Sequence, residues 1–266
     1  MTAPRGMTLS LAGRTIAVTR PHSDEDALST RLVELHAHLL EAPAIAIAPP
    51  RSWSDLDQAL GEIEGTHWIA FASANAVERT VARAAELGIP VGALARPRLA
   101  AIGPGTAARL SRLLRAPDLV AAAARGEALA TALAPHVRGQ RVLVPRPEEA
   151  RPELAEGLTK AGAEVVSPVA YRSVPAPPES LATLAAALAA GAVDAVAFAS
   201  PSAVRGAVAG LGSEARLLAR TTLAAIGPTT AAELRAHGLA VAVLPERSSG
   251  VGLAEALAER LGPRLG

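Results

Sequence analysis

The sequence has 266 residues, of which half are hydrophobic and only 2% aromatic, and its formal net charge is +1. That length suits two domains, whose cores must consist mainly of Ala, Leu and Val. The absence of cysteine excludes disulfides, thiolate metal sites and a cysteine nucleophile. The small net charge and scattered Arg residues argue against a nucleic-acid partner. Residues 1–10 lack a signal-peptide pattern and no apolar run would span a membrane, so we expect a cytoplasmic protein with no membrane partner.

Strand and helix patterns alternate along the chain. Residues 15–19 predict a strand, and residues 23–26 (SDED) provide helix N-cap chemistry. The leucines that follow, at helical spacing, predict a helix with one apolar face. They are Leu28, Leu32, Leu35 and Leu39. The other predicted strands are residues 45–48, 68–72, 99–102, 142–144, 165–169, 195–199, 223–226 and 241–244. This alternation predicts an α/β fold, in which parallel sheets carry helices on both faces.

Three segments of the first half recur in the second half. They pair residues 13–21 (GRTIAVTRP) with 139–147 (GQRVLVPRP), 68–77 (WIAFASANAV) with 195–204 (AVAFASPSAV), and 99–108 (LAAIGPGTAA) with 223–232 (LAAIGPTTAA). All three occur in the same order and at nearly one offset. A period this long indicates duplicated domains rather than a solenoid.

The recurring segments place polar residues where strands end and helices begin. In parallel α/β sheets, ligands bind beyond the carboxyl ends of the strands. Helix caps and free backbone N–H groups at such junctions attract carboxylate or phosphate, although simple capping without a ligand is the alternative. The candidate residues at two of these junctions are Ser73, Ala74, Asn75, Ser200, Pro201 and Ser202. Arg20 and Arg146 each end the first strand of a copy, where an Arg either pairs with a carboxylate or lies exposed in a loop.

The segment from Gly103 to Ala108 matches the G-x-G-x-x-A pattern of dinucleotide sites. The second copy has Thr229 in place of the second glycine, and the next strand of the first copy lacks an acidic end. We therefore favour helix caps that offer hydroxyls to a ligand, and keep a nucleotide-dependent oxidoreductase as an alternative. The candidate residues here are Gly103, Thr106, Gly227, Thr229 and Thr230.

Tyr171 is the only tyrosine, and it lies near a Pro/Ser-rich break at residues 174–180. Its phenol is a candidate proton donor or hydrogen-bond partner, with a packed aromatic at a strand edge as the alternative. The six histidines show no metal-ligand spacing, because His36 and His38 are two apart on a predicted helix and diverge. We therefore expect no metal site.

Together these motifs resemble the uroporphyrinogen-III synthase family. The matching segments are residues 18–21 (VTRP), 71–77 (FASANAV), 101–103 (AIG), 169–172 (VAYR), 198–204 (FASPSAV) and 225–231 (AIGPTTA). They extend over nearly the whole chain, and their order is more specific than any single segment.

The resemblance implies two flavodoxin-like lobes joined by two crossing strands. Lobe 1 would comprise residues 1–46 and 174–266, and lobe 2 residues 47–173. It also implies a monomeric, cofactor-free enzyme that dehydrates hydroxymethylbilane and closes it to uroporphyrinogen III with ring D inverted. Tyr171 matches the family tyrosine thought to assist departure of the hydroxyl. A non-catalytic two-lobe binder or regulatory paralogue is the alternative.

Overall fold

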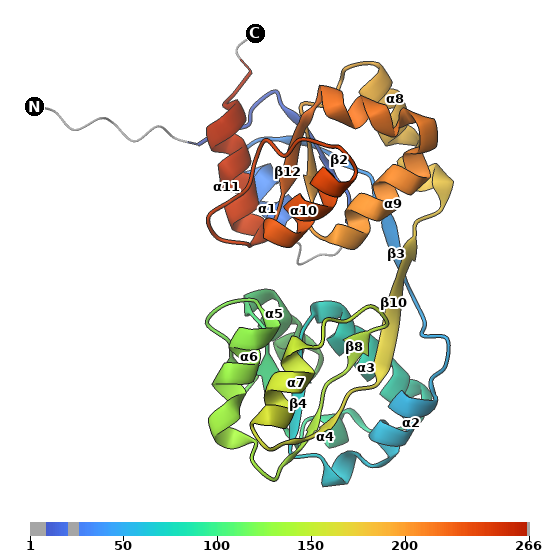
Figure 1. Ribbon diagram of the computed structural model, residues 1–266, viewed down its shortest axis with the longest axis vertical. Coiled ribbons are helices and arrows are strands. Elements are labelled where there is room, and N and C mark those ends of the chain that lie inside the picture. The colour runs from blue at the N-terminus through green and yellow to red at the C-terminus, as the bar shows by residue number, and fades with distance from the viewer. Residues whose placement is uncertain (1–8, 21–26, 265–266) are drawn as a thin grey trace, which may run out of the picture. The chain divides into compact units, whose positions relative to one another are not determined.

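The computed structural model describes residues 9–20 and 27–264, and the predicted N-cap residues 23–26 lie outside that part. The chain forms two compact units. Unit 1 takes residues up to Ala46 and from Val174 onwards, and unit 2 is Ile47–Ser173. Because the units do not follow one another along the chain, the backbone passes between them twice (Figure 1).

Unit 1 contains a parallel sheet of four strands in the order β12-β11-β1-β2. They are β1 (Thr15–Val18), β2 (His38–Glu41), β11 (Ala195–Phe198) and β12 (Thr222–Ala225). Ile16 and Val18 face one apolar cluster and Ala17 faces another, as the alternation of side chains along a strand requires. Both faces of the sheet are therefore buried, which explains its continuous apolar strands.

Helices cover both clusters of unit 1. The α-helices are α1 (Ala27–Glu34), α8 (Ala182–Ala189), α9 (Pro201–Leu211), α10 (Pro228–Ala236) and α11 (Gly250–Leu261), and the 3-10 helices are η3 (Pro178–Leu181) and η4 (Gly212–Arg220). Leu28 of α1 and Leu253 of α11 share one cluster, whereas Leu184 of α8 and Val204 of α9 share the other. α1 and α11 run side by side although they lie near opposite ends of the chain (Figure 1).

Unit 2 contains a parallel sheet of five strands in the order β6-β5-β4-β7-β9. They are β4 (Trp68–Phe71), β5 (Arg98–Ala101), β6 (Leu119–Val120), β7 (Arg141–Leu143) and β9 (Glu164–Val166). Its helices are α2 (Ser54–Gly61), η1 (Ile63–Gly65), α3 (Ala74–Glu86), α4 (Val91–Leu94), α5 (Pro104–Leu113), α6 (Gly126–Leu133), η2 (Ala134–His136) and α7 (Glu153–Lys160). Ile69 and Phe71 face one cluster, and Trp68 and Ala70 face the other.

A third sheet lies where the chain passes between the units. It contains β3 (Ile45–Ala48), β10 (Val169–Pro175) and β8 (Arg146–Pro147), in the order β3-β10-β8. Residues 45–48 thus form a strand, as predicted, but outside the sheet of β1. Within the described residues, the neighbouring strands of the two larger sheets are parallel, so the predicted α/β class is confirmed.

The predicted helix through Leu39 is wrong in its second half. α1 ends at Glu34, His36 adopts a positive φ of 65°, and Leu39 lies in β2 beside Ile16. Hydrogen bonding to β1 outweighs the helical spacing of the leucines, because a strand pairing is decided by distant residues. His36 and His38 therefore do not share a helix.

Two predicted strands of the second half also differ from the structure. Residues 165–169 divide into β9 and β10 around Ser167 and Pro168, since proline cannot donate a ladder hydrogen bond. Residues 241–244 form only an isolated bridge, between Val243 and Ala224. This edge segment pairs too briefly to count as a strand.

Candidate active site

The junction of β4 and α3 presents a serine at the carboxyl end of the sheet. β4 ends at buried Phe71, and Ser73 adopts extended backbone as the N-cap of α3. Its Oγ accepts a hydrogen bond from the backbone N–H of Ala76 at 3.1 Å. The predicted cap is therefore confirmed, with Ala74 and Asn75 in the first turn of the helix.

Tyr171 lies against this junction, although it is 98 residues further along the chain. Its ring packs in the same apolar cluster as Phe71 and Ala76, and only 6% of the residue is exposed. The phenolic oxygen lies 3.0 Å from Ser73 Oγ. Burial raises the pKa of the phenol, and hydrogen bonding to Ser73 and Asn75 opposes that rise. The structure thus brings together three of the predicted residues, Ser73, Asn75 and Tyr171. The phenol of Tyr171 keeps its proton at neutral pH.

Unit 1 repeats this junction without a tyrosine. Ser200 caps α9, and its Oγ accepts from the backbone N–H of Ala203 at 3.1 Å. The second partner of that oxygen is Ser202 Oγ, at 2.9 Å. Pro201 occupies the first turn, where the N–H it lacks would have no helical partner. The cap is confirmed here too, but its hydroxyl bonds to a neighbour on its own helix.

Gly103 and Gly227 are the N-caps of α5 and α10, and both have extended backbone. Another loop approaches both glycines closely. A Cβ on Gly227 would lie 2.7 Å from Ser248 Oγ, and one on Gly103 would lie 3.3 Å from Ala124 Cβ. Ala124 and Ser248 are 124 residues apart, as the two glycines are, so the covering loop belongs to the duplicated unit.

Sequence reasoning missed this covering loop. Its two copies, residues 121–125 (AAAAR) and 245–249 (PERSS), differ at every aligned position. The usable signal is the constant spacing from each loop to the glycine that begins the next helix, Gly126 or Gly250.

The prediction that threonines cap these helices is wrong. Neither α5 nor α10 has a side-chain cap bond, because glycine is the N-cap and a proline follows it in each helix. Thr106 and Thr230 lie within the helices and are 6% and 1% exposed. Of the three candidate threonines, Thr229 is the exposed one.

The two candidate arginines are placed differently. Arg146 begins β8 rather than ending a strand, and its guanidinium donates to three backbone carbonyls, those of Ser167, Pro147 and Glu148, at 3.1–3.2 Å. These bonds fix the guanidinium to its own unit. Arg20 lies two residues beyond β1 and next to the segment outside the described structure.

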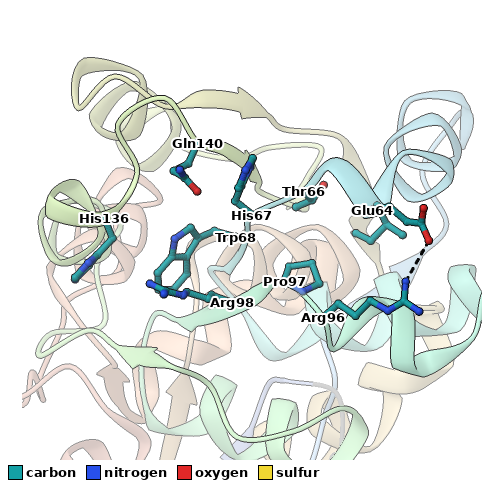
Figure 2. A pocket seen from close by; sticks show the side chains of 10 residues that line it. Glu64, Thr66, His67, Trp68, Arg96, Pro97, Arg98, His136 and Gln140 are labelled. Atoms are coloured by element: carbon teal, nitrogen blue, oxygen red, sulfur yellow. Dashed lines mark hydrogen bonds and ion pairs between the residues drawn. The ribbon is translucent and has the colours of Figure 1, made fainter.

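A hollow of about 560 Å³ lies at the opposite end of β4 (Figure 2). Trp68 is one of its lining residues, with the Arg98 guanidinium 5.6 Å from the indole centroid, and Glu64 pairs with Arg96 at 3.1 Å (Figure 2). None of the predicted site residues lines this hollow. Since parallel sheets bind ligands at the carboxyl ends of their strands, we place the candidate site at Tyr171 and Ser73 instead.

Two other findings concern the described residues alone. No group of three or more His, Cys, Asp or Glu side chains is arranged to hold a metal ion. No helix of that part of the chain is long and apolar enough to cross a membrane.

Fold and site together define a two-unit parallel α/β protein with a buried phenol at a strand-to-helix junction. The sequence model of the family described as "Uroporphyrinogen-III synthase HemD" matches residues 26–255. The chain belongs to the uroporphyrinogen-III synthase family, which consists of enzymes that act on a tetrapyrrole substrate.

Individual relatives agree with this assignment. A putative uroporphyrinogen-III synthase of Methanothermobacter thermautotrophicus is 32% identical over 93% of this chain and 98% of its own length. A uroporphyrinogen-III synthase of Synechococcus elongatus is also 32% identical, over 61% of this chain and 62% of its own length. The latter match therefore spans less than two thirds of that relative.

Solved structures show the same fold. The chain matches a uroporphyrinogen-III synthase of Thermus thermophilus with a TM-score of 0.56 and 22% identity, over 94% of this chain and 99% of the other. It matches the uroporphyrinogen-III synthetase of Helicobacter pylori with a TM-score of 0.58 and 16% identity, over 93% and 98%. These likenesses confirm the expected architecture.

Proposed function

We propose that this chain closes hydroxymethylbilane to uroporphyrinogen III, and that Tyr171 donates the proton to the departing hydroxyl. The observation that carries the proposal is the buried phenol at the β4–α3 junction, with its oxygen 3.0 Å from Ser73 Oγ. A general acid must hold its proton at the working pH, and burial raises the pKa of this phenol.

The proposed chemistry begins with cleavage of the terminal carbon–oxygen bond. The electron pair of the pyrrole nitrogen expels the hydroxyl, which takes the phenolic proton of Tyr171 and leaves as water. The resulting azafulvene is attacked by the substituted carbon of ring D to form a spiro intermediate. That intermediate reopens and closes again with ring D inverted, and the proton released from the ring carbon restores the phenol.

Backbone N–H groups at four helix starts are the proposed anchors for the carboxylates of the substrate. α3 and α5 in unit 2, and α9 and α10 in unit 1, each begin directly after a strand. Helix N-termini bind anions through free N–H groups and the helix dipole. The carbonyl bonds of the Arg146 guanidinium support this choice, because they commit three of its five donors.

Two further groups of residues belong to this proposal. The side chains of Asn75, Ser202 and Thr229 lie at the helix starts and would add hydroxyl or amide contacts. Gly103 and Gly227 would contribute through their backbone alone, because a neighbouring loop fills the space that a Cβ would take. We also propose that the chain acts as a monomer in the cytoplasm.

Selection between the two ring closures needs little energy. Closure in solution proceeds without inversion, so the enzyme must favour the spiro route. A hundredfold preference corresponds to about 2.7 kcal/mol. Several carboxylate contacts that hold the chain in a bent conformation would provide this difference.

Isomer analysis of the product tests the proposal directly. Purified protein is given hydroxymethylbilane, and the products are separated into type I and type III uroporphyrinogen after oxidation. We expect type III in excess, with type I alone in the reaction without protein. Type I alone in both reactions would refute the enzyme assignment and support the non-catalytic alternative.

A further inference from the structure

The hydroxyl of Ser73 forms hydrogen bonds with two groups. It accepts the backbone N–H of Ala76 at 3.1 Å and lies 3.0 Å from the phenolic oxygen of Tyr171. A serine hydroxyl has one proton to donate and two lone pairs. Its bond to the helix start uses a lone pair, so its proton remains available for the phenol.

The direction of the Ser73–Tyr171 bond decides what the phenol can do. If the phenol donates to Ser73, its proton is committed to the protein. If Ser73 donates, the phenolic proton is left for another acceptor. We propose that Ser73 is a positioning residue, which donates to the phenolic oxygen of Tyr171, directs the phenolic proton to the substrate and stabilises the phenolate that forms. This inference rests on the proposed function of Tyr171.

The surroundings of the bond support a donor role for Ser73. Ser73 is the N-cap of the 13-residue helix α3, whose N-terminus favours negative charge nearby. Hydrogen bonding with Ser73 and Asn75 acts to lower the pKa of the phenol, against the larger effect of burial.

Charged side chains around Tyr171 are engaged elsewhere. Arg172, the next residue of β10, and Arg146 of the adjoining strand β8 both donate to backbone carbonyls. Glu148, which follows β8, and Glu78 of α3 are each ion-paired with an arginine. The neutral neighbours Ser73 and Asn75 are therefore the groups to which we assign control of the phenol.

Unit 1 provides the internal comparison. Ser200 caps its helix with the same geometry, yet its hydroxyl bonds to Ser202. Capping thus needs no tyrosine, and the bond to Tyr171 is an addition of unit 2.

Titration of the phenol tests the bond without any substrate. Tyr171 is the only tyrosine of the sequence, so the tyrosinate absorbance reports on it alone. Circular dichroism at each pH restricts the titration to folded protein. We expect Ser73→Ala to raise the pKa of the phenol and Ser73→Thr to leave it near the wild-type value. A lowered or unchanged pKa in Ser73→Ala would mean that the phenol is the donor and would overturn the inference.

Kinetics provide the second measurement. Because a hydrogen bond to a charged group contributes about 1.5–3 kcal/mol, Ser73→Ala should lower kcat at least about tenfold with little change in KM. The control is Ser249→Ala, which removes the cap of α11, where Ser249 Oγ accepts from Gly252 N–H at 3.1 Å. It should leave kcat unchanged. An equal loss of kcat in both variants would mean that Ser73 acts only as a helix cap, and would overturn its positioning role.

The two proposals fail in different ways. Wild-type protein that yields no type III isomer refutes the function, whatever the phenol titration gives. Wild-type activity together with an unmoved phenol pKa in Ser73→Ala refutes the inference alone.

Discussion

The two units have the same strand order but differ in chemistry. β5-β4-β7-β9 of unit 2 corresponds to β12-β11-β1-β2 of unit 1, and the recurring sequence segments map onto corresponding strands. Both units cap a helix with serine after the strand β4 or β11. Only the serine of unit 2 bonds to a buried phenol. The comparison teaches that duplication preserved the backbone frame, while the buried phenol belongs to one copy.

The helices that flank these caps also pack differently. In unit 2, Arg83 of α3 makes a bidentate ion pair with Asp57 of α2, both contacts at 2.7 Å, and stacks on Trp53. The corresponding positions of unit 1, 127 residues later, are Gly210 and Leu184. The helix contact is therefore ionic in unit 2 and apolar in unit 1, which gives each unit its own response to acid.

The largest expected effect concerns a position at which unit 1 has a glycine and unit 2 has an arginine. Gly206 corresponds to Arg79 of unit 2, and a Cβ on Gly206 would collide with the backbone carbonyl oxygen of Ala44. We expect Gly206→Ala to lower the free energy of unfolding of unit 1 by about 3 kcal/mol, because neither backbone can move far. Urea unfolding followed by circular dichroism measures the loss.

The matched control is Arg79→Ala, which should change stability by less than about 0.5 kcal/mol. Tryptophan fluorescence separates the units, since Trp53 and Trp68 both belong to unit 2. Equal effects of the two variants would show that the units pack alike at this position.

The second effect concerns the phenol. Tyr171→Phe keeps the ring in its apolar cluster but removes the proton, so we expect kcat to fall about a hundredfold with the fold intact. Ser202→Ala, at the corresponding junction of unit 1, should reduce kcat less than about tenfold. Steady-state kinetics with isomer analysis measure both, and an unchanged kcat in Tyr171→Phe would remove its role as acid.

A smaller difference is expected between the two glycine caps. A methyl group on Gly227 meets Ser248 Oγ at 2.7 Å, whereas one on Gly103 meets Ala124 Cβ at 3.3 Å. We expect Gly227→Ala to lower the free energy of unfolding by about 1–2 kcal/mol and Gly103→Ala by less. Because both variants replace an N-cap glycine by alanine, the difference between them reports the closer contact at Gly227. Thermal unfolding of the two variants makes the test, and the reverse order would contradict it.

The smallest effect is the acid response of unit 2. Hydrogen bonding to Arg83 lowers the pKa of Asp57, so the ion pair contributes stability above the unfolded pKa of about 3.9 and loses it as the pH falls through the folded pKa. The pair is partly exposed, and its contribution is correspondingly small. Asp57→Asn should therefore destabilise unit 2 at neutral pH and match the wild type in strong acid. Acid unfolding monitored by tryptophan fluorescence, which reports on unit 2, checks this, and a pH-independent difference would contradict it.

Local features could be predicted from the sequence. The central strands and the serine caps follow from recurring segments, because a strand, its cap and the next helix are adjacent in the chain. Ser73 and Ser200 are the clearest cases, since each bonds to an N–H three residues away.

Distant pairings could not be predicted. Leu39 has helical spacing from the preceding leucines, yet it lies in the edge strand β2, which pairs with β1. The bond between Ser73 and Tyr171 joins residues 98 positions apart, and no local pattern specifies it. Thr106 and Thr230 lie in segments that are typical of helix caps, but a glycine is the N-cap of each helix and a proline follows it. In each case a tertiary contact overrides a short-range preference.

The division of unit 1 between two distant stretches has a consequence for synthesis on the ribosome. β1 pairs with β11, and Arg14 donates to the carbonyl oxygens of Leu261 and Gly262, each at 3.1 Å. The residues of unit 2 are all available once residue 173 has emerged, so this unit can fold while translation continues. At that stage β1 can pair with β2 but not with β11, which is not yet translated. A nascent chain arrested before β11 would therefore carry the phenol-bearing unit folded and unit 1 unfinished.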